Sequence, residues 1–215
     1  MALYDQPAWV NTVLERTGHS QLKYVGHSQG TTQFMLANTL HDYEEFGSKI
    51  KKFVALSPPL FLGNLNSILM RAAIDYDLDK WAYKHWNQVL VLQPGFDSVL
   101  HIFDWLVVRY SPAALTFIPR TTWTFVQGLT GMDAVSHMDT ERMPMMAKND
   151  VGGTSTRNLA HWAQLARTGK VETFSMDETE RVAYDLAKLK DSLKDTKMLL
   201  FRGTTDSCVV EEDFA

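Results

Sequence analysis

The chain has 215 residues, of which 45% are hydrophobic and 21% are charged, and its net charge is −4 at pH 7. These proportions are ordinary for a globular protein long enough to bury a core. The only basic run holds three lysines within residues 49–52, so the composition argues against a nucleic-acid partner. The sequence has no apolar run of about 18 residues, and residues 1–16 lack the order of a signal peptide, so we expect neither feature. Cys208 is the single cysteine, which excludes an internal disulfide.

The first part of the chain predicts a helix, a strand, a second helix and a second strand. Residues 7–17 carry apolar side chains at helical spacing, with Pro7 suited to the first turn and Gly18 to a C-cap. Residues 21–25 and 52–56 are short, mostly apolar runs typical of strands, and residues 31–43 between them favour a helix. A strand–helix–strand order predicts a right-handed crossover and a parallel pair of strands.

Residues 26–30, GHSQG, form a G-x-S-x-G run between the first predicted strand and the second predicted helix. In that context the run is typical of a nucleophile elbow, where a serine sits on a strained turn at the N-terminus of a helix. We expect Gly26 and Gly30 to remove Cβ atoms that would clash. The hydroxyl of Ser28 would then stand above the sheet, and the backbone N–H of Gln29 would face an oxyanion. A plain Gly/Ser turn is the alternative for the bare run, but the flanking strand and helix favour the elbow.

Residues 60–185 predict a largely helical region, because they are rich in aromatic residues and methionine and have little β-branched alternation. Its large apolar side chains would either contact acyl chains or form the region's own core; they include Trp81, Trp86, Trp105, Trp123, Met138, Met143, Met145 and Met146. A helix with Leu186, Leu189 and Leu193 follows, and then a strand over residues 196–201. The loop after that strand ends at Asp206. We therefore expect a core over residues 1–59, a helical cap over 60–185, and a return to the core over 186–215.

Four stretches resemble the acid lipase family, which includes the gastric and lysosomal lipases of the α/β-hydrolase fold. They are residues 1–8 (MALYDQPA), 26–32 (GHSQGTT), 199–206 (LLFRGTTD), and 149–169, which contains Gly153-Thr154-Ser155, Asn158, His161-Trp162 and Gln164. The resemblance implies a partial α/β-hydrolase fold of about three parallel strands, with a large helical cap insertion. It also implies a carboxylic ester hydrolase of lipid metabolism that acts on triacylglycerols or sterol esters at a lipid–water interface, without a cofactor or metal. The family is typically secreted or lysosomal, and this sequence does not fix the compartment.

The family's catalytic order is serine, then acid, then histidine. Ser28 fits the nucleophile, and Asp206 fits the acid at the end of a strand, although an ordinary loop-capping aspartate is the alternative. All of the histidines precede Asp206: His19, His27, His41, His85, His101, His137 and His161. The resemblance implies that His27 faces away from the serine and that His161 has a packing role. His137 is the only candidate for an improvised base.

The same family places four strands before the elbow strand, and one of their loops supplies the second oxyanion donor. Here only residues 1–20 precede the first predicted strand. We therefore expect a middle-to-late fragment of an acid lipase that lacks the catalytic histidine and is feeble alone. The alternative is a non-catalytic lipid-binding or partner-binding remnant; a thioesterase or peptidase is a weaker third reading.

We also expect an open edge on the strand that holds Tyr24, and exposed strand residues around Val25, Val54 and Leu200. Such a chain would self-associate through that edge. If the Tyr24 side chain faced water, Tyr24→Lys would improve solubility.

Overall fold

The computed structural model describes residues 1–40, 42–85, 90–91 and 154–214. The chain divides into two compact units, Met1–Asn64 with Thr168–Ala215, and Leu65–Arg167, and each unit is described by itself. Several residues named above lie outside the described part: His41, Trp86, His101, Trp105, Trp123, His137, Met138, Met143, Met145 and Met146. The assignment of residues 60–185 to a cap, and the boundaries given for it, stay predictions.

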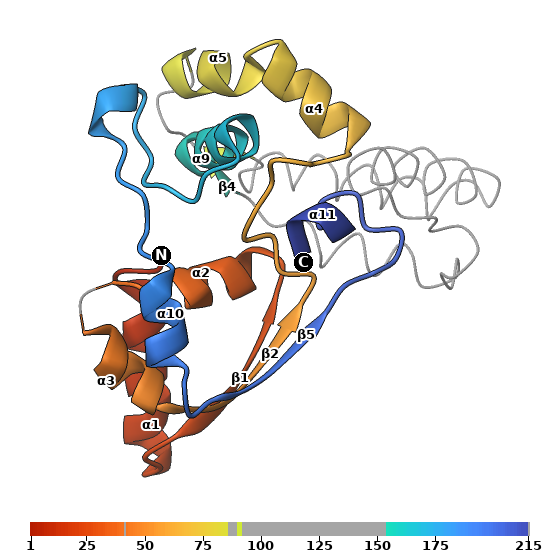
Figure 1. The fold of residues 1–215 in the computed structure, drawn as a ribbon. Helices are drawn as coiled ribbons and strands as arrows, with labels where there is room; N and C mark the ends of the chain where they lie inside the picture. The colour runs from red at the N-terminus through yellow and green to blue at the C-terminus, as the bar shows by residue number, and fades with distance from the viewer. Residues whose placement is uncertain (41, 86–89, 92–153, 215) are drawn as a thin grey trace, which may run out of the picture. The chain divides into compact units, whose positions relative to one another are not determined.

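The first unit contains a parallel sheet with the strand order β1-β2-β5 (Figure 1). Its strands are β1 (Leu22–His27), β2 (Ile50–Leu56) and β5 (Lys197–Phe201). Both strand pairs are parallel, so the expected α/β arrangement of about three parallel strands is confirmed in the described residues. All three strands therefore end at the same edge of the sheet, where ligand sites of parallel sheets gather.

Four helices lie on one side of this sheet (Figure 1): α1 (Asp5–Thr17), α2 (Gln29–Ala37), α3 (Tyr43–Ser48) and α10 (Ala187–Ser192). The predicted C-cap of α1 is confirmed, because Gly18 has a φ of 68° and its N–H donates to the Leu14 carbonyl. The helix predicted over residues 31–43 is instead two helices. Asn38 ends α2 by donating its side-chain amide to the Phe34 carbonyl at 2.8 Å, and Asp42 is left-handed, with a φ of 60°. Both features stop a right-handed helix.

The core of the first unit lies between these helices and the sheet. Phe34 of α2 and Phe53 of β2 are fully buried, and their ring centroids are 4.3 Å apart. Tyr24 of β1 stacks on Phe34 at 4.2 Å, so its side chain faces the helices rather than water. Strand alternation places Tyr24 on the covered face of the sheet. The improved solubility expected of Tyr24→Lys required a side chain that faces water, so it is no longer expected.

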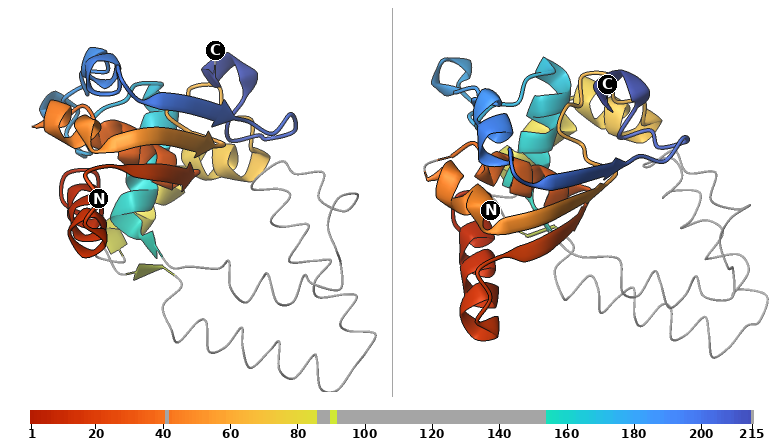
Figure 2. Two further views of the ribbon diagram at one scale, coloured as in Figure 1. Left: turned by 90° about the horizontal axis from the view of Figure 1, so that it is seen from below. Right: turned by 60° about the horizontal axis from the view of Figure 1, so that its bottom comes forward.

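Among the described residues of the first unit, no helix covers the opposite face of the sheet (Figure 2). Val25 of β1 is 65% exposed, although it sits in the middle of a strand, and Val54 beside it is half-buried. Leu200, at the far end of β5 on the covered face, is also 44% exposed. The expected exposure of Val25 and Leu200 is confirmed. Within the described residues β1 pairs with β2 alone, which leaves the other edge of β1 open.

The same unit includes the 3₁₀ turn η1 (Glu178–Glu180) and the short helix α11 (Glu211–Phe214). Near η1, the Arg181 guanidinium pairs with the buried carboxylate of Glu172 at 3.6 Å. Arg181 is itself largely buried, so each charge has an opposite charge beside it, which offsets part of the cost of burying the two groups in this loop.

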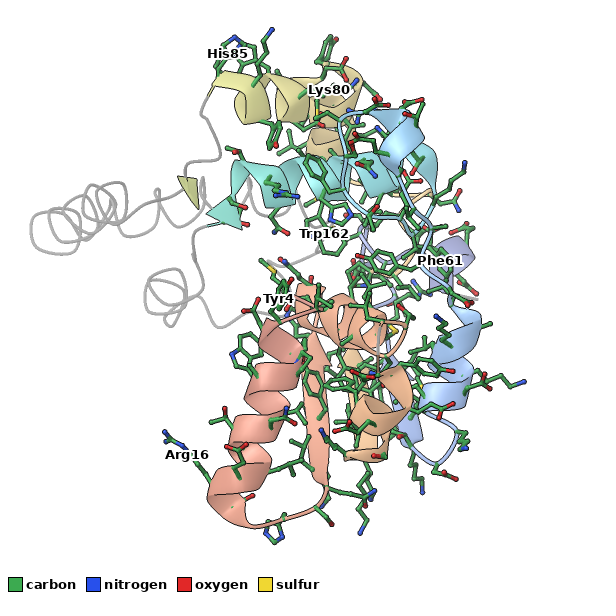
Figure 3. All side chains as sticks on the ribbon, turned by 90° about the vertical axis from the view of Figure 1, so that its left-hand side faces the viewer. Tyr4, Arg16, Phe61, Lys80, His85 and Trp162 are labelled. Atoms are coloured by element: carbon green, nitrogen blue, oxygen red, sulfur yellow. The ribbon has the colours of Figure 1, made fainter. Side chains whose placement is uncertain are left out.

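The second unit contains the helices α4 (Ile68–Asp75), α5 (Leu78–His85) and α9 (Thr156–Thr168). Thr168, the last residue of α9, belongs to the first unit. The second unit also contains the antiparallel pair β3 (Leu90–Val91) with β4 (Thr154–Ser155). Arg167 near the end of α9 bonds to the Ile74 carbonyl, to Asp77 and to Asp79 at 2.9–3.2 Å. These contacts fix α9 against the turn between α4 and α5. Lys80 and His85 of α5 and Trp162 of α9 are labelled in Figure 3. Among the described helices, none has both the length and the apolar character needed to cross a membrane.

Candidate active site

Ser28 occupies the turn between β1 and α2, as the sequence predicts for an elbow serine. Its backbone has φ 49° and ψ −124°, which is sparsely populated for any residue with a Cβ. Its N–H donates to the Leu56 carbonyl at 2.9 Å, so the parallel ladder holds this strained residue in place. The Ser28 hydroxyl makes no capping hydrogen bond to α2. The turn therefore presents a half-buried serine at the positive end of a helix.

The two glycines of the motif differ in what they do. A Cβ at Gly26 would lie 3.0 Å from Tyr24 Cε1 and 3.1 Å from both the backbone nitrogen and the methyl group of Thr31. A Cβ at Gly30 would meet nothing within 4 Å. The expected clash is found at Gly26 and is absent at Gly30, because Gly30 already lies within α2.

Two residues that the sequence analysis did not assign to the site, Thr31 and Tyr24, brace this turn. The Thr31 hydroxyl and backbone N–H donate to the Ser28 carbonyl at 2.6 and 2.9 Å. The Tyr24 hydroxyl donates to the Gly30 carbonyl at 3.1 Å. The Thr31 contact could have been predicted from the sequence, because a threonine three residues after the turn serine can donate its hydroxyl to a local carbonyl.

The backbone N–H of Gln29 belongs to the first residue of α2. Backbone N–H groups at the first position of a helix lie at its positive end, which favours an anion beside the serine. Its role as an oxyanion donor stays a prediction.

Asp206 lies in the loop after β5, five residues beyond Phe201. Its Oδ1 accepts from the backbone N–H groups of Cys208 at 2.9 Å and Val209 at 3.0 Å. Arg202 braces the same loop through the Gly203 carbonyl at 3.2 Å and Glu211 at 3.4 Å. Asp206 therefore performs the loop-capping role that was the alternative for it, which leaves a catalytic role untested, because a carboxylate can accept further bonds.

The strand ends connect Ser28 and Asp206 through β2. The Ser28 N–H donates to Leu56, the last residue of β2, and the Ser57 N–H donates to Phe201, the last residue of β5, at 2.7 Å. With strands about 4.8 Å apart, the ends of β1 and β5 are separated by about 10 Å. Residues following these two ends are within reach of one shared imidazole if their side chains converge, so the pairing stays a prediction.

Neither Ser28 nor Asp206 is hydrogen-bonded to a histidine in the part of the chain that the structure describes. His27 is exposed, and strand alternation places it on the face of the sheet opposite Gly26. His85 stacks on Trp81 and bonds to its carbonyl at 2.8 Å, within the second unit. His161 is half-buried in α9. His137, the candidate for an improvised base, is outside the described residues.

Other site chemistries find little support among the described residues. No cluster of three His, Cys, Asp or Glu side chains that could hold a metal ion occurs there. Burial raises the pKa of the Cys208 thiol, and the nearby Asp206 carboxylate raises it further. Cys208 therefore stays a thiol at neutral pH and is a poor nucleophile.

A sequence model of the alpha/beta hydrolase fold matches residues 1–211. The chain thus belongs to the α/β-hydrolase fold family, in agreement with the parallel sheet and the strand–turn–helix at Ser28.

Within that family the chain is acid lipase-like. It is 29% identical to human Lipase member K over 184 residues, which are 84% of this chain and 42% of that protein. It is 31% identical to Lipase lipl-3 of Caenorhabditis elegans over 183 residues, 84% of this chain and 43% of the relative. Mouse gastric triacylglycerol lipase is 28% identical over 175 residues, 81% of this chain and 41% of the relative. The chain thus spans less than half the length of these curated relatives.

Proposed function

We propose that this chain carries the nucleophile and the acid of a carboxylic ester hydrolase of the lipase kind. Ser28 is the nucleophile, Asp206 is the acid and the Gln29 N–H is one oxyanion donor. The observation that carries the proposal is the strained backbone of Ser28 between β1 and the N-terminus of α2. Strain of this kind persists where the surrounding structure over-determines it, and it is common at active sites.

The reaction would proceed by acyl transfer. Ser28 Oγ attacks the ester carbonyl while a histidine takes its proton; the histidine then gives that proton to the leaving oxygen, so the ester C–O bond breaks, the alcohol departs and an acyl-serine remains. The negative charge on the carbonyl oxygen is stabilised by the Gln29 N–H and by the dipole of α2. Water then hydrolyses the acyl-serine. Asp206 would orient the imidazole, for which the strand ends linked through Leu56 and Ser57 provide the spacing.

The substrate class comes from the relatives. One relative is a gastric triacylglycerol lipase by name, and two others are lipases. We infer a lipid carboxylic ester, a triacylglycerol or a sterol ester, met at a lipid–water interface. The aromatic and methionine-rich residues of 60–185 would form the cap over its acyl chains.

The proposed mechanism also requires a histidine that acts as the base for Ser28. Since Ser28 and Asp206 have no histidine partner among the described residues, we infer that the 215 residues are a middle-to-late segment of such an enzyme. The base would come from polypeptide beyond them. The same observation favours the second candidate, a remnant of a lipase that binds lipid or a partner without turnover.

The genomic sequence on both sides of the coding region distinguishes the candidates. An upstream strand loop containing His-Gly and a downstream histidine would identify a segment of an intact enzyme. The extended polypeptide should then hydrolyse tributyrin, and Ser28→Ala should lower kcat by about 10³-fold or more. Asp206→Asn should lower it by a comparable factor, because a mispositioned imidazole is a poor base.

The 215-residue chain alone should be feeble towards a short p-nitrophenyl ester. Turnover at the rate of an intact lipase, abolished by Ser28→Ala, would show instead that a histidine upstream of Asp206 has been recruited. Ester hydrolysis by the extended polypeptide that persists unchanged in Ser28→Ala would overturn the proposal.

A further inference from the structure

The first turn of α2 holds two hydrogen bonds that follow one another in the same direction. The Tyr24 hydroxyl donates to the Gly30 carbonyl at 3.1 Å. The peptide group of that carbonyl also carries the Thr31 N–H, which donates to the Ser28 carbonyl at 2.9 Å. A carbonyl and the N–H that follows it lie in one planar peptide group. The Ser28 carbonyl therefore shares its peptide with the Gln29 N–H, the proposed oxyanion donor.

Thr31 holds the second of these peptides at two points. Its hydroxyl also donates to the Ser28 carbonyl, at 2.6 Å, and Thr31 is fully buried, so water does not compete for this hydroxyl. The direction of the Gln29 N–H is set by rotation about ψ of Ser28, which is −124° in a sparsely populated conformation with φ 49°. Two donors on one carbonyl oppose the rotation that would relieve this strain. Thr31 therefore fixes the direction in which the Gln29 N–H points.

The Tyr24 hydroxyl keeps its proton and so remains a donor at neutral pH. Burial raises the pKa of this hydroxyl above its ordinary value, and a hydrogen bond from the Gln6 side chain opposes only part of that rise. Gln6, on α1, is itself fully buried. Hydrogen bonds in series polarise one another, by about 10–30% per bond. Each bond from Tyr24 to the Ser28 carbonyl therefore makes the Gln29 N–H a stronger donor.

The same pair of bonds to one carbonyl occurs at the other end of α2, where no site is proposed. The Thr39 hydroxyl and N–H donate to the Leu36 carbonyl at 2.8 and 3.0 Å, and Thr39 is 5% exposed. That carbonyl shares its peptide with the Ala37 N–H. Thr39 therefore matches Thr31 in residue type, burial and bonding, and differs in the peptide that it holds.

We propose that Thr31 and Tyr24 are positioning residues for the oxyanion site beside Ser28. They act through the Ser28–Gln29 peptide, which they orient and polarise towards the carbonyl oxygen of a carboxylic ester as that oxygen becomes negative. Neither residue touches the substrate or transfers a proton. The inference rests on the proposed function and adds to it the residues that prepare the oxyanion donor.

The ratio of two substrates tests this in the extended polypeptide. One is p-nitrophenyl butyrate, and the other is its thiono ester, in which sulfur replaces the carbonyl oxygen and accepts hydrogen bonds weakly. A variant with less folded protein loses kcat/KM towards both esters alike, so the ratio of the two values does not change. Weaker oxyanion stabilisation lowers the ratio, because it acts mainly on the oxygen ester.

Thr31→Val should lower this ratio about tenfold, which is part of the roughly 10²–10³-fold effect of a whole oxyanion donor, and the loss towards the oxygen ester should lie in kcat. Thr31→Ser keeps the hydroxyl and should restore most of the ratio. Tyr24→Phe, one peptide further from the site, should lower the ratio by a smaller factor. Thr39→Val should leave it unchanged, although its loss of stability should be similar.

The outcomes separate this inference from the proposed function. An unchanged ratio in Thr31→Val and Tyr24→Phe, while Ser28→Ala abolishes hydrolysis, would overturn the inference and leave the proposed function standing. An equal fall of the ratio in Thr31→Val and Thr39→Val would overturn the inference as well. Hydrolysis that persists in Ser28→Ala would overturn the proposed function, and the oxyanion role with it.

A second measurement follows the peptide itself and needs no activity. Serine labelled with ¹³C in its carbonyl and glutamine labelled with ¹⁵N give NMR signals from the Ser28–Gln29 and Ser20–Gln21 peptides of the 215-residue chain. In a Val25→Lys background, Thr31→Val should move both Ser28–Gln29 signals upfield, because that carbonyl loses a hydrogen bond. The Ser20–Gln21 signals should not move, and Thr39→Val should move neither pair. Ser28–Gln29 signals that do not move in Thr31→Val would show that the hydroxyl does not act on this peptide, and would overturn the inference.

Discussion

The two glycines of the G-x-S-x-G motif should respond in opposite ways to the same substitution. A Cβ at Gly26 would press against Tyr24 Cε1 at 3.0 Å and against the Thr31 backbone at 3.1 Å. A Cβ at Gly30 would meet no atom within 4 Å. Neither glycine has a positive φ, so packing rather than backbone conformation decides the outcome.

The magnitudes follow from these contacts. Overpacking a close contact lowers the free energy of unfolding by about 1–3 kcal/mol. Replacing glycine by alanine also restricts the unfolded chain, which raises the free energy of unfolding by about 0.4–1 kcal/mol. Gly26→Ala should therefore lower the free energy of unfolding by about 1–2 kcal/mol. Gly30→Ala should leave it unchanged or raise it by up to about 1 kcal/mol, because alanine is the better residue within α2.

Urea and thermal unfolding of both variants, followed by circular dichroism, measure the difference. Both should be made in a Val25→Lys background, which limits association through the exposed sheet face that holds Val25. Since 1 kcal/mol shifts Tm by about 2–4 °C at this chain length, we expect the variants to melt about 4–10 °C apart, with Gly30→Ala higher. Equal stabilities, or a more stable Gly26→Ala, would refute the packing argument for the elbow.

Three further outcomes are expected. Val25→Lys should raise the monomer fraction in sedimentation velocity, whereas Tyr24→Lys should prevent folding because it buries a charge beside Phe34. A folded Tyr24→Lys variant together with an unfolded Val25→Lys variant would mean that the two faces of the sheet are misassigned. Thr31→Val should lower the free energy of unfolding in urea by about 0.5–1.5 kcal/mol through loss of the 2.6 Å bond to the Ser28 carbonyl, and no change would exclude this brace. Burial raises the pKa of Tyr24 above its ordinary value of 10.0, so the folded state holds this proton more tightly and Tm should fall as pH rises above 10. Tyr24→Phe should make Tm fall less steeply with pH between pH 9 and 11. An unchanged dependence of Tm on pH would mean that other groups cause the fall.

Local pattern was sufficient to predict the elbow. The strand, the Gly-x-Ser-x-Gly run and the helix are contiguous, so the turn at Ser28 follows from neighbouring residues alone. The parallel pairing of β1 with β2 followed from the same local order, because a single crossover joins them.

Features that depend on distant residues were harder to predict. The break at Asn38 comes from a side-chain amide that bonds to its own helix in a position of tight burial. Strand alternation predicts that the side chains of Tyr24 and Val25 lie on opposite faces of the sheet. Which of the two faces is exposed depends on the elements that cover the sheet, and these are distant in sequence. Whether Asp206 acts as acid or only as loop cap depends on a histidine that local sequence cannot place.

Site-specific phosphonylation tests the central claim, that Ser28 is a nucleophile set up by its turn. Ser57 is a matched control in the same chain, because it follows the neighbouring strand with a φ of 47° but precedes two prolines instead of a helix. After treatment of the extended polypeptide, which supplies the histidine, with a small alkyl fluorophosphonate, tandem mass spectrometry should find the adduct on Ser28 at least about tenfold more often than on Ser57, and none at that position in Ser28→Ala. Equal labelling of the two serines, or an adduct elsewhere with Ser28 unmodified, would contradict the account.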